Sequence, residues 1–167
     1  MKITANIATM PSRLNELKQT LDSLEGQFDE IRIYLNEFTD IPKWLKNDYT
    51  IATGNNLTDN GKFYFLQFTQ DEYYFTLDDD IIYPPTYARD MVAKIKEHKT
   101  IVTQHGRILI QKDVSYYAGH EFFHCANDQY EEKLIDVPGT GVTAFDTRYF
   151  KPTEIFNSVN KCMSDIV

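Results

Sequence analysis

The sequence contains few cysteines, no cluster of basic residues and no long apolar run, and each of these absences excludes a class of protein. Only two cysteines occur, Cys125 and Cys162, and they stand far apart without a C-x-x-C spacing. Two such thiols do not make a disulfide scaffold, and their spacing does not indicate a thiolate metal site.

The charge balance argues against nucleic-acid binding and against membrane binding through a polybasic segment. The formal net charge is -8, and the lysines and arginines are scattered along the chain. Nucleic-acid-binding proteins usually carry a basic patch, and many peripheral membrane proteins use a polybasic segment. We therefore expect no nucleic-acid partner. An acidic protein can still bind a diphosphate when a divalent cation lies between the two.

No apolar run approaches the length of a transmembrane helix, so we expect no integral membrane segment. The first residues do not resemble a signal peptide, because their apolar stretch is short and is broken at Asn6. These features favour a soluble protein in the reducing cytoplasm, either free or in peripheral contact with the inner membrane face.

What the sequence does contain fits one globular domain. Its 167 residues, with a hydrophobic fraction of 42%, suffice for a sizeable core. Eleven tyrosines and eleven phenylalanines supply core volume, and some of these rings are available to stack on a base or a sugar.

Hydrophobic periodicity predicts alternating strands and helices in the first hundred residues. Strands are expected at 3–9, 30–35, 49–53, 73–77 and 101–104, and helices at 11–24, 62–69 and through Met91 and Ile95. This alternation predicts an α/β sheet with right-handed crossovers. Ligands bind such sheets at the carboxyl ends of the strands, where Thr9, Thr53 and Asp78 are expected.

The later part of the chain is less regular. Strands at 134–137 and 142–145 are expected to flank Pro138-Gly139-Thr140-Gly141, which favours an ordinary hairpin turn. Alternatively, Gly139 and Gly141 let the backbone approach a bound donor or acceptor closely. Residues 105–128 have no pattern that assigns them to a helix or a strand.

The most informative segment is Asp78-Asp79-Asp80, which directly follows an apolar strand ending at Leu77. Three adjacent like charges repel, so a cation or another partner is expected. Carboxylate oxygens suit Mg²⁺ or Mn²⁺, and such a metal would neutralise and orient a diphosphate leaving group. The alternative is a solvated acidic turn.

Two other ion and nucleotide motifs do not fit. An EF-hand loop that began at Asp78 would need glycine and glutamate where the chain has Tyr83 and Arg89. A P-loop would need serine or threonine after Lys62, and Phe63 stands there instead.

The order of four segments resembles the GT-A superfamily of glycosyltransferases, especially bacterial members like those of family 2. The segments are Ala5–Arg13 with the helix to Leu24, Asp59–Phe63, Asp78–Asp80 and Met163–Ile166. Asp78–Asp80 matches the D-x-D metal motif of the superfamily. The resemblance implies a single Rossmann-like domain over residues 1–167, with a mixed, mostly parallel sheet flanked by helices.

The resemblance also implies an activity. Members transfer a sugar from a nucleotide-diphosphate donor, commonly with Mn²⁺ or Mg²⁺, and family 2 members invert the anomeric centre. The implied acceptor is a glycan or lipid-linked hydroxyl, as in bacterial surface polysaccharide synthesis.

Individual roles follow residue by residue. The nucleotide-sugar contacts map to Thr9, Arg13, Lys62, Asp78 and Asp79, and the metal ligands map to Asp78 and Asp80. Asp79 would face the sugar, and Lys62 would meet a phosphate or the base. For Arg13 and Lys62 the alternative is a solvated side chain at the start of a helix.

The catalytic acidic residue of the family maps to Asp165, which would deprotonate the acceptor hydroxyl as general base. An ordinary surface aspartate is the alternative. Members of the family usually continue well beyond this residue, whereas the chain ends at Val167. The chain is therefore expected to be a domain truncated at its C-terminus, a minimal domain or one part of a larger protein. In each case we expect it to bind the donor but to transfer sugar poorly.

A competing motif is His120-Glu121-Phe122-Phe123-His124, which matches H-E-x-x-H. On a helix, His120 and His124 would share a face and bind Zn²⁺, with Glu121 as the general base of a hydrolase. The metzincin continuation is missing, because Asn127 and Tyr130 replace its glycine and third histidine. A third alternative is a domain that binds a nucleotide sugar without turning it over.

Overall fold

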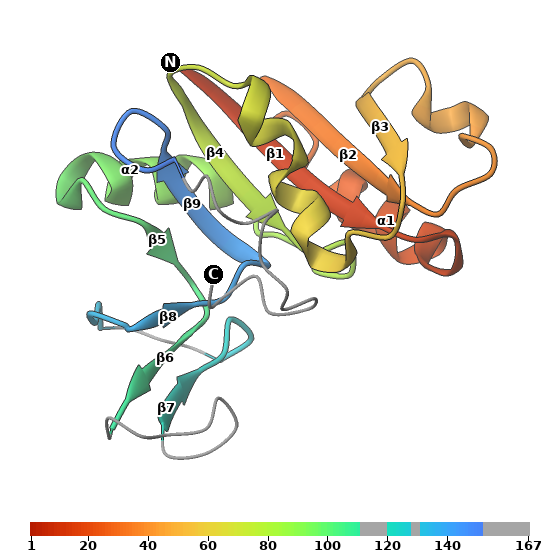
Figure 1. Cartoon of the computed structure of the whole chain (residues 1–167). Helices are drawn as coiled ribbons and strands as arrows, with labels where there is room; N and C mark the ends of the chain where they lie inside the picture. Colours follow the sequence, from red (N-terminus) through yellow and green to blue (C-terminus); the bar gives the residue numbers. More distant parts are fainter. Residues whose placement is uncertain (111–119, 128–130, 152–167) are drawn as a thin grey trace.

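The computed structural model describes residues 1–110, 120–127 and 131–151, and its main body is a six-stranded sheet (Figure 1). The strand order is β3-β2-β1-β4-β9-β5. The bounds are β1 (Lys2–Thr9), β2 (Glu30–Asn36), β3 (Thr50–Gly54), β4 (Glu72–Leu77), β5 (Val102–Thr103) and β9 (Val142–Asp146). Strands β3, β2, β1 and β4 run parallel to one another. Strand β9 is antiparallel to both of its neighbours, β4 and β5. The predicted mixed, mostly parallel α/β sheet is confirmed.

Helices flank both faces of this sheet. α1 (Leu14–Ser23) follows the short 3-10 helix η1 (Pro11–Arg13), and α2 (Tyr87–His98) follows the aspartate cluster. Another 3-10 helix, η2 (Lys43–Leu45), precedes β3. Residues 58–68, expected in part as a loop and in part as a helix, form the continuous 3-10 helix η3 (Thr58–Phe68).

The main hydrophobic core lies on the face that α1 and α2 cover. Alternate strand residues such as Ile7, Ile33 and Phe75 are fully buried there. Leu17 and Leu21 from α1 and Met91 and Ile95 from α2 complete it. The three- and four-residue spacing along each helix places these side chains in one stripe, which is why the periodicity predicted both helices.

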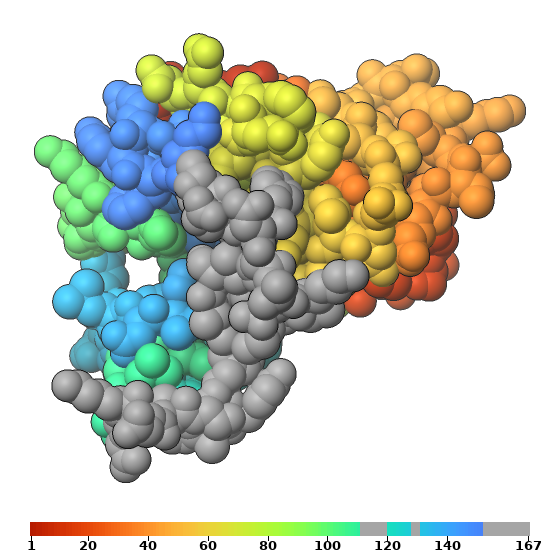
Figure 2. Space-filling view, in the orientation of Figure 1, coloured from red at the N-terminus to blue at the C-terminus, as the bar shows by residue number. Residues whose placement is uncertain are grey.

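The opposite face of the sheet is covered by η3, which lies in front of the sheet in Figure 2. A smaller cluster joins Phe63 and Leu66 of η3 to Tyr74 and Phe145 of the sheet. Gly61 permits this close approach, because a Cβ there would lie 2.7 Å from the Tyr34 ring. η3 is therefore held tightly against the sheet, and its Lys62 reaches the first residue of the aspartate cluster, Asp78.

A second, three-stranded sheet projects from one end of the molecule (Figure 1). It comprises β6 (Gly106–Leu109), β7 (His120–Phe123) and β8 (Val137–Pro138). The predicted hairpin around residues 138–141 is wrong, because β8 pairs with β6 while β9 pairs with β4 and β5. The two residues of β8 offer too few backbone bonds to hold β9 beside them. The glycine-containing segment thus connects two sheets.

A buried ion pair joins strands β2 and β4 of the main sheet. Arg32 donates to both oxygens of Glu72, at 2.8 and 3.1 Å, and Thr4 donates to the same carboxylate at 2.8 Å. The side chains of Arg32 and Glu72 are 10% and 4% exposed. These contacts link β1, β2 and β4 across the centre of the sheet.

Among the residues that the structure describes, no helix combines the length and apolar character needed to cross a bilayer.

Replacement of Glu72 by glutamine should lower the free energy of unfolding by about 3 kcal/mol, because it leaves the buried Arg32 charge without its partner. Urea denaturation measures this difference. An unchanged midpoint would show that water or another group compensates Arg32.

Glu30→Gln is the matched control, because Glu30 contacts the same arginine at 2.6 Å but is more exposed. Burial opposes ionisation of Glu30, but hydrogen bonds from Thr50, Lys2 and Arg32 outweigh it and lower its pKa to about 2. Its contribution is thus present above its unfolded value of 4.5 and is lost as the pH falls through about 2. Solvent screening reduces the roughly 3 kcal/mol that this shift implies, so the Glu30→Gln difference should be about 1–3 kcal/mol at neutral pH and should vanish in acid.

Candidate functional site

The main sheet brings polar residues to the carboxyl ends of its parallel strands. Thr9 ends β1, and the backbone register pairs it with Leu35, which in turn pairs with Thr53. Asp78 directly follows β4, one position beyond the pairing of Leu77 with Ile7. Thr9, Thr53 and Asp78 therefore lie along one edge, as the sequence predicted.

Asp79 is the buried member of the aspartate cluster, with 5% of its surface exposed. Its Oδ2 accepts a hydrogen bond of 2.6 Å from the Thr9 hydroxyl, and its Oδ1 lies 2.9 Å from Arg13 Nε. Burial raises the pKa of the Asp79 carboxyl, although the Thr9 hydrogen bond and the Arg13 charge act in the opposite direction. Both oxygens are occupied, so Asp79 is the least suited of the three to bind an added ion.

Asp78 and Asp80 are half-exposed, and each is paired with a cation. Lys62 Nζ contacts Asp78 Oδ1, and an Nη of Arg13 lies 2.5 Å from Asp80 Oδ2. Lys62 itself is only 4% exposed, so the alternative of a solvated lysine does not hold. Three carboxylates thus face two cations, which leaves one negative charge uncompensated and attracts a further cation.

Strand β4 fixes the backbone of Lys62. Tyr74 in β4 donates a hydrogen bond of 2.6 Å to the carbonyl oxygen of Lys62. The same strand therefore places Asp78 at its end and fixes the backbone that carries the partner lysine.

The segment between the two sheets forms the opposite wall. The Asp78 N–H lies 3.1 Å from the Gly141 carbonyl oxygen and 2.9 Å from the Tyr83 hydroxyl, which donates to the same carbonyl at 2.6 Å. Burial raises the pKa of Tyr83, so its hydroxyl keeps the proton that it donates. A Cβ on Gly141 would lie 1.9 Å from Asp78 Oδ2. Only glycine fits there without displacing the carboxylate.

A cavity of about 210 Å³ opens beside Asp78. It is lined by Asp59, Lys62, Asp78, Ile81, His105, Cys125, Gly139, Thr140, Gly141 and Val142. Its volume falls below the roughly 300–1,000 Å³ of pockets that enclose a whole small ligand. The cavity therefore has room for only one part of a small ligand.

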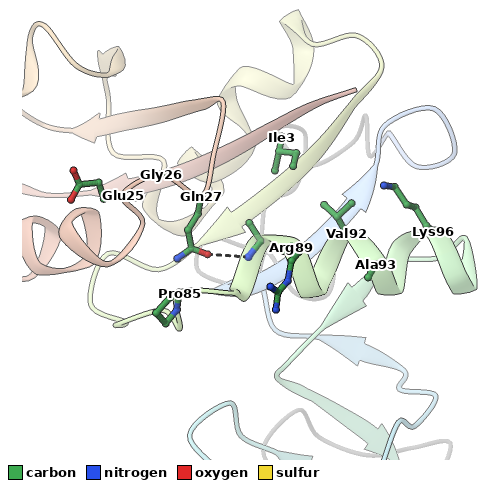
Figure 3. A pocket seen from close by; sticks show the side chains of 10 residues that line it. Ile3, Glu25, Gly26, Gln27, Pro85, Arg89, Val92, Ala93 and Lys96 are labelled. Atoms are coloured by element: carbon green, nitrogen blue, oxygen red, sulfur yellow. Dashed lines mark hydrogen bonds between the residues drawn. The ribbon is translucent and has the colours of Figure 1, made fainter.

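A larger hollow of about 530 Å³ lies between the turn at Gly26 and helix α2 (Figure 3). Gln27 bridges the two, accepting a hydrogen bond of 3.2 Å from the Ala88 N–H. Its lining is more apolar than polar and includes none of the three clustered aspartates, so it offers no comparable chemistry.

The H-E-x-x-H segment does not form the helix that the zinc hydrolase alternative requires. Residues His120–Phe123 form strand β7, paired with β6. A rise of about 3.3 Å per strand residue separates positions 120 and 124 by roughly 13 Å, too far for one zinc ion. The prediction of a zinc site from His120, Glu121 and His124 is therefore wrong.

The remaining sequence-derived residue, Asp165, lies outside the described residues, as does Cys162. The sequence analysis did not single out Tyr83, His105 or Cys125 in these positions. Tyr83 had no local signal, since its hydroxyl acts on residues brought close only by the fold.

Comparisons with known proteins give a distant structural likeness. No protein-family description and no curated protein sequence matches the chain. Two solved structures of TarS residues 1-349 from S. aureus, one of them in complex with UDP-GlcNAc, match at 19% identity with a TM-score of 0.45. They cover 66% and 71% of this chain, which spans 36% of the TarS chain. Likeness at this level does not transfer an activity.

Gly141→Ala should displace the Asp78 carboxylate and weaken any divalent-ion binding at the cluster, with a stability loss of about 1–3 kcal/mol from the forced contact. Titration of Mn²⁺ measures the first effect, and urea denaturation measures the second.

Gly26→Ala is the control, because a Cβ there meets nothing within 4 Å while the positive φ of 71° disfavours alanine. It should lose about 1 kcal/mol of stability and keep its ion binding. Equal ion binding by both variants would contradict the role given to Gly141.

Proposed function

We propose that the chain is the nucleotide-sugar-binding domain of a metal-dependent glycosyltransferase. It would move a sugar from a nucleotide-diphosphate donor to a glycan or lipid-linked hydroxyl acceptor. The observation that carries this proposal is the arrangement of Asp78 and Asp80, two half-exposed carboxylates at the carboxyl edge beside a cavity, each paired with a cation.

The donor set fits Mn²⁺ or Mg²⁺. Asp78 and Asp80 supply hard oxygen ligands, and both would have to exchange an ion pair with Lys62 or Arg13 for a bond to the metal. A bound divalent ion would neutralise the diphosphate and stabilise it as a leaving group.

The displaced cations would then serve the donor. Lys62 and Arg13, released from the carboxylates, lie beside the expected path of the diphosphate, and a guanidinium binds phosphate oxygens in pairs. Thr9 and Asp79 position Arg13 through the contacts at 2.6 and 2.9 Å. The polar groups of the edge thus exchange partners within one site, which keeps the buried charges paired throughout.

The acceptor step needs a base. We assign it to Asp165, in keeping with an inverting displacement in which the base takes the hydroxyl proton as the oxygen attacks the anomeric carbon. The nucleoside diphosphate then leaves with the electron pair of the broken bond.

The test of donor binding is calorimetry with nucleoside diphosphates of different bases, with Mn²⁺ and with EDTA. We expect binding only with the metal, and Asp80→Asn should weaken it by at least ~10-fold, because one metal ligand loses its charge. A matched control is Asp71→Asn, which changes an aspartate at the opposite end of β4 from the cluster. Equal affinity in EDTA, or wild-type binding by Asp80→Asn, would overturn the metal bridge.

The test of catalysis compares the Asp165→Asn variant with the unchanged protein. Sugar transfer should fall by at least ~100-fold while donor affinity stays unchanged, since general-base catalysis contributes about 10²–10⁴. Donor binding without any sugar transfer would favour a non-catalytic binding domain.

A further inference from the structure

His105, His124 and Cys125 form a cluster beside the cavity that the H-E-x-x-H motif does not describe. Each offers one ligand atom, and these atoms lie within 4.8 Å of one another. The residues come from two separate segments: His105 directly precedes β6, and the other two directly follow β7. Because β6 and β7 pair in antiparallel register, with Gly106 opposite Phe123, the ends of the two strands meet there.

We propose that this cluster is a zinc site with three protein ligands and an open fourth position that faces the cavity. Imidazole nitrogen and thiolate sulfur are the ligand types that Zn²⁺ prefers over Mg²⁺ or Mn²⁺. His105 and Cys125 line the cavity, so the fourth ligand would be water or an oxygen of a molecule bound there. This inference does not rest on the proposed transferase activity.

The distances require a modest closure. Zinc bonds of about 2.0–2.3 Å place ligand atoms roughly 3.5 Å apart in a tetrahedron, so the three side chains must draw together by up to about 1.3 Å from their present 4.8 Å. His124 is exposed, so a change of its side-chain rotamer is the least hindered of these movements. Its Nδ1 accepts a hydrogen bond of 3.1 Å from the Ala126 N–H, and this bond would be lost whichever ring nitrogen binds the metal. Water can replace it, because Ala126 is exposed.

The surroundings favour a dication. Burial raises the pKa of the Cys125 thiol, and the Asp78 and Asp80 charges raise it further. The same negative charges attract a zinc ion, whose bond to sulfur stabilises the thiolate directly. The negative electrostatic potential of the aspartate cluster therefore also acts at Cys125.

The backbone already holds His105 in position. The Gly139 N–H donates to the His105 carbonyl at 2.7 Å, and the Thr103 hydroxyl donates to the same oxygen at 2.9 Å. A Cβ on Gly139 would lie 2.5 Å from His105 Cδ2, so the ring packs directly on the glycine. A metal at this site would brace the segment 139–141, which also forms the wall opposite Asp78.

The probe is Zn²⁺ alone, titrated by calorimetry into protein freed of metal by a chelator and kept reduced. Co²⁺ provides a second readout, since a cobalt–thiolate bond gives a charge-transfer absorption that an all-oxygen site lacks. We expect one high-affinity zinc per chain and a thiolate band with cobalt. Cys125→Ser should abolish the band and weaken zinc binding by at least ~10-fold. Loss of a residue that only hydrogen-bonds a metal ligand already costs about 10–100-fold in affinity, and loss of a ligand should cost no less.

The controls separate this site from its neighbours. Cys162→Ser tests the other thiol, His120→Ala tests the H-E-x-x-H alternative, and Asp80→Asn tests the aspartates; all three should keep the cobalt band. If Cys125→Ser fails to give native circular dichroism, His124→Ala at an exposed position replaces it and should weaken zinc binding by the same factor. Cobalt bound without a thiolate band, or zinc affinity unchanged in both ligand variants, would overturn the proposal, whereas nucleotide binding bears on neither outcome.

Discussion

Repulsion between three consecutive carboxylates is the constraint around which this molecule is arranged. Asp78, Asp79 and Asp80 stand at the end of one strand, and the fold provides two cations from different directions to hold them there. Arg13 comes from the turn after β1, and Lys62 comes from η3 on the far face of the sheet. Elements on both faces of the sheet therefore supply a cation to the same edge. The packing of these elements against the sheet determines the positions of the two cations relative to the carboxylates.

The sequence predicted the main sheet and its helices well because their signals are local. The spacing of Leu17 and Leu21 defines a helical stripe within α1, whatever the rest of the chain does. The hairpin at 138–141 failed for the opposite reason. Its strands were adjacent in sequence, yet β8 is only two residues long and finds its partner in β6, some thirty residues earlier. Pairing of that kind has no signature in the turn itself.

The candidate site divides in the same way. The aspartates could be found because an apolar strand runs directly into them, but the burial of Lys62 depends on the path of η3. The zinc alternative at His120 and His124 fails because that spacing places two side chains together only on a helix, and β7 is a strand. Cys125 lacked any motif, since its neighbours in space are His124 beside it and His105 from the segment before β6.

The segment that joins the two sheets has a consequence of its own. Gly139 packs on His105 and Gly141 packs on Asp78, with a single residue between them. A backbone movement at one of these glycines would reach the other through Thr140 alone. Any effect that a ligand at one of the two proposed sites has on affinity at the other would be matched by an equal effect in return, because linkage between two binding equilibria is reciprocal. The segment 139–141 thus contacts a residue of each of the two proposed metal sites.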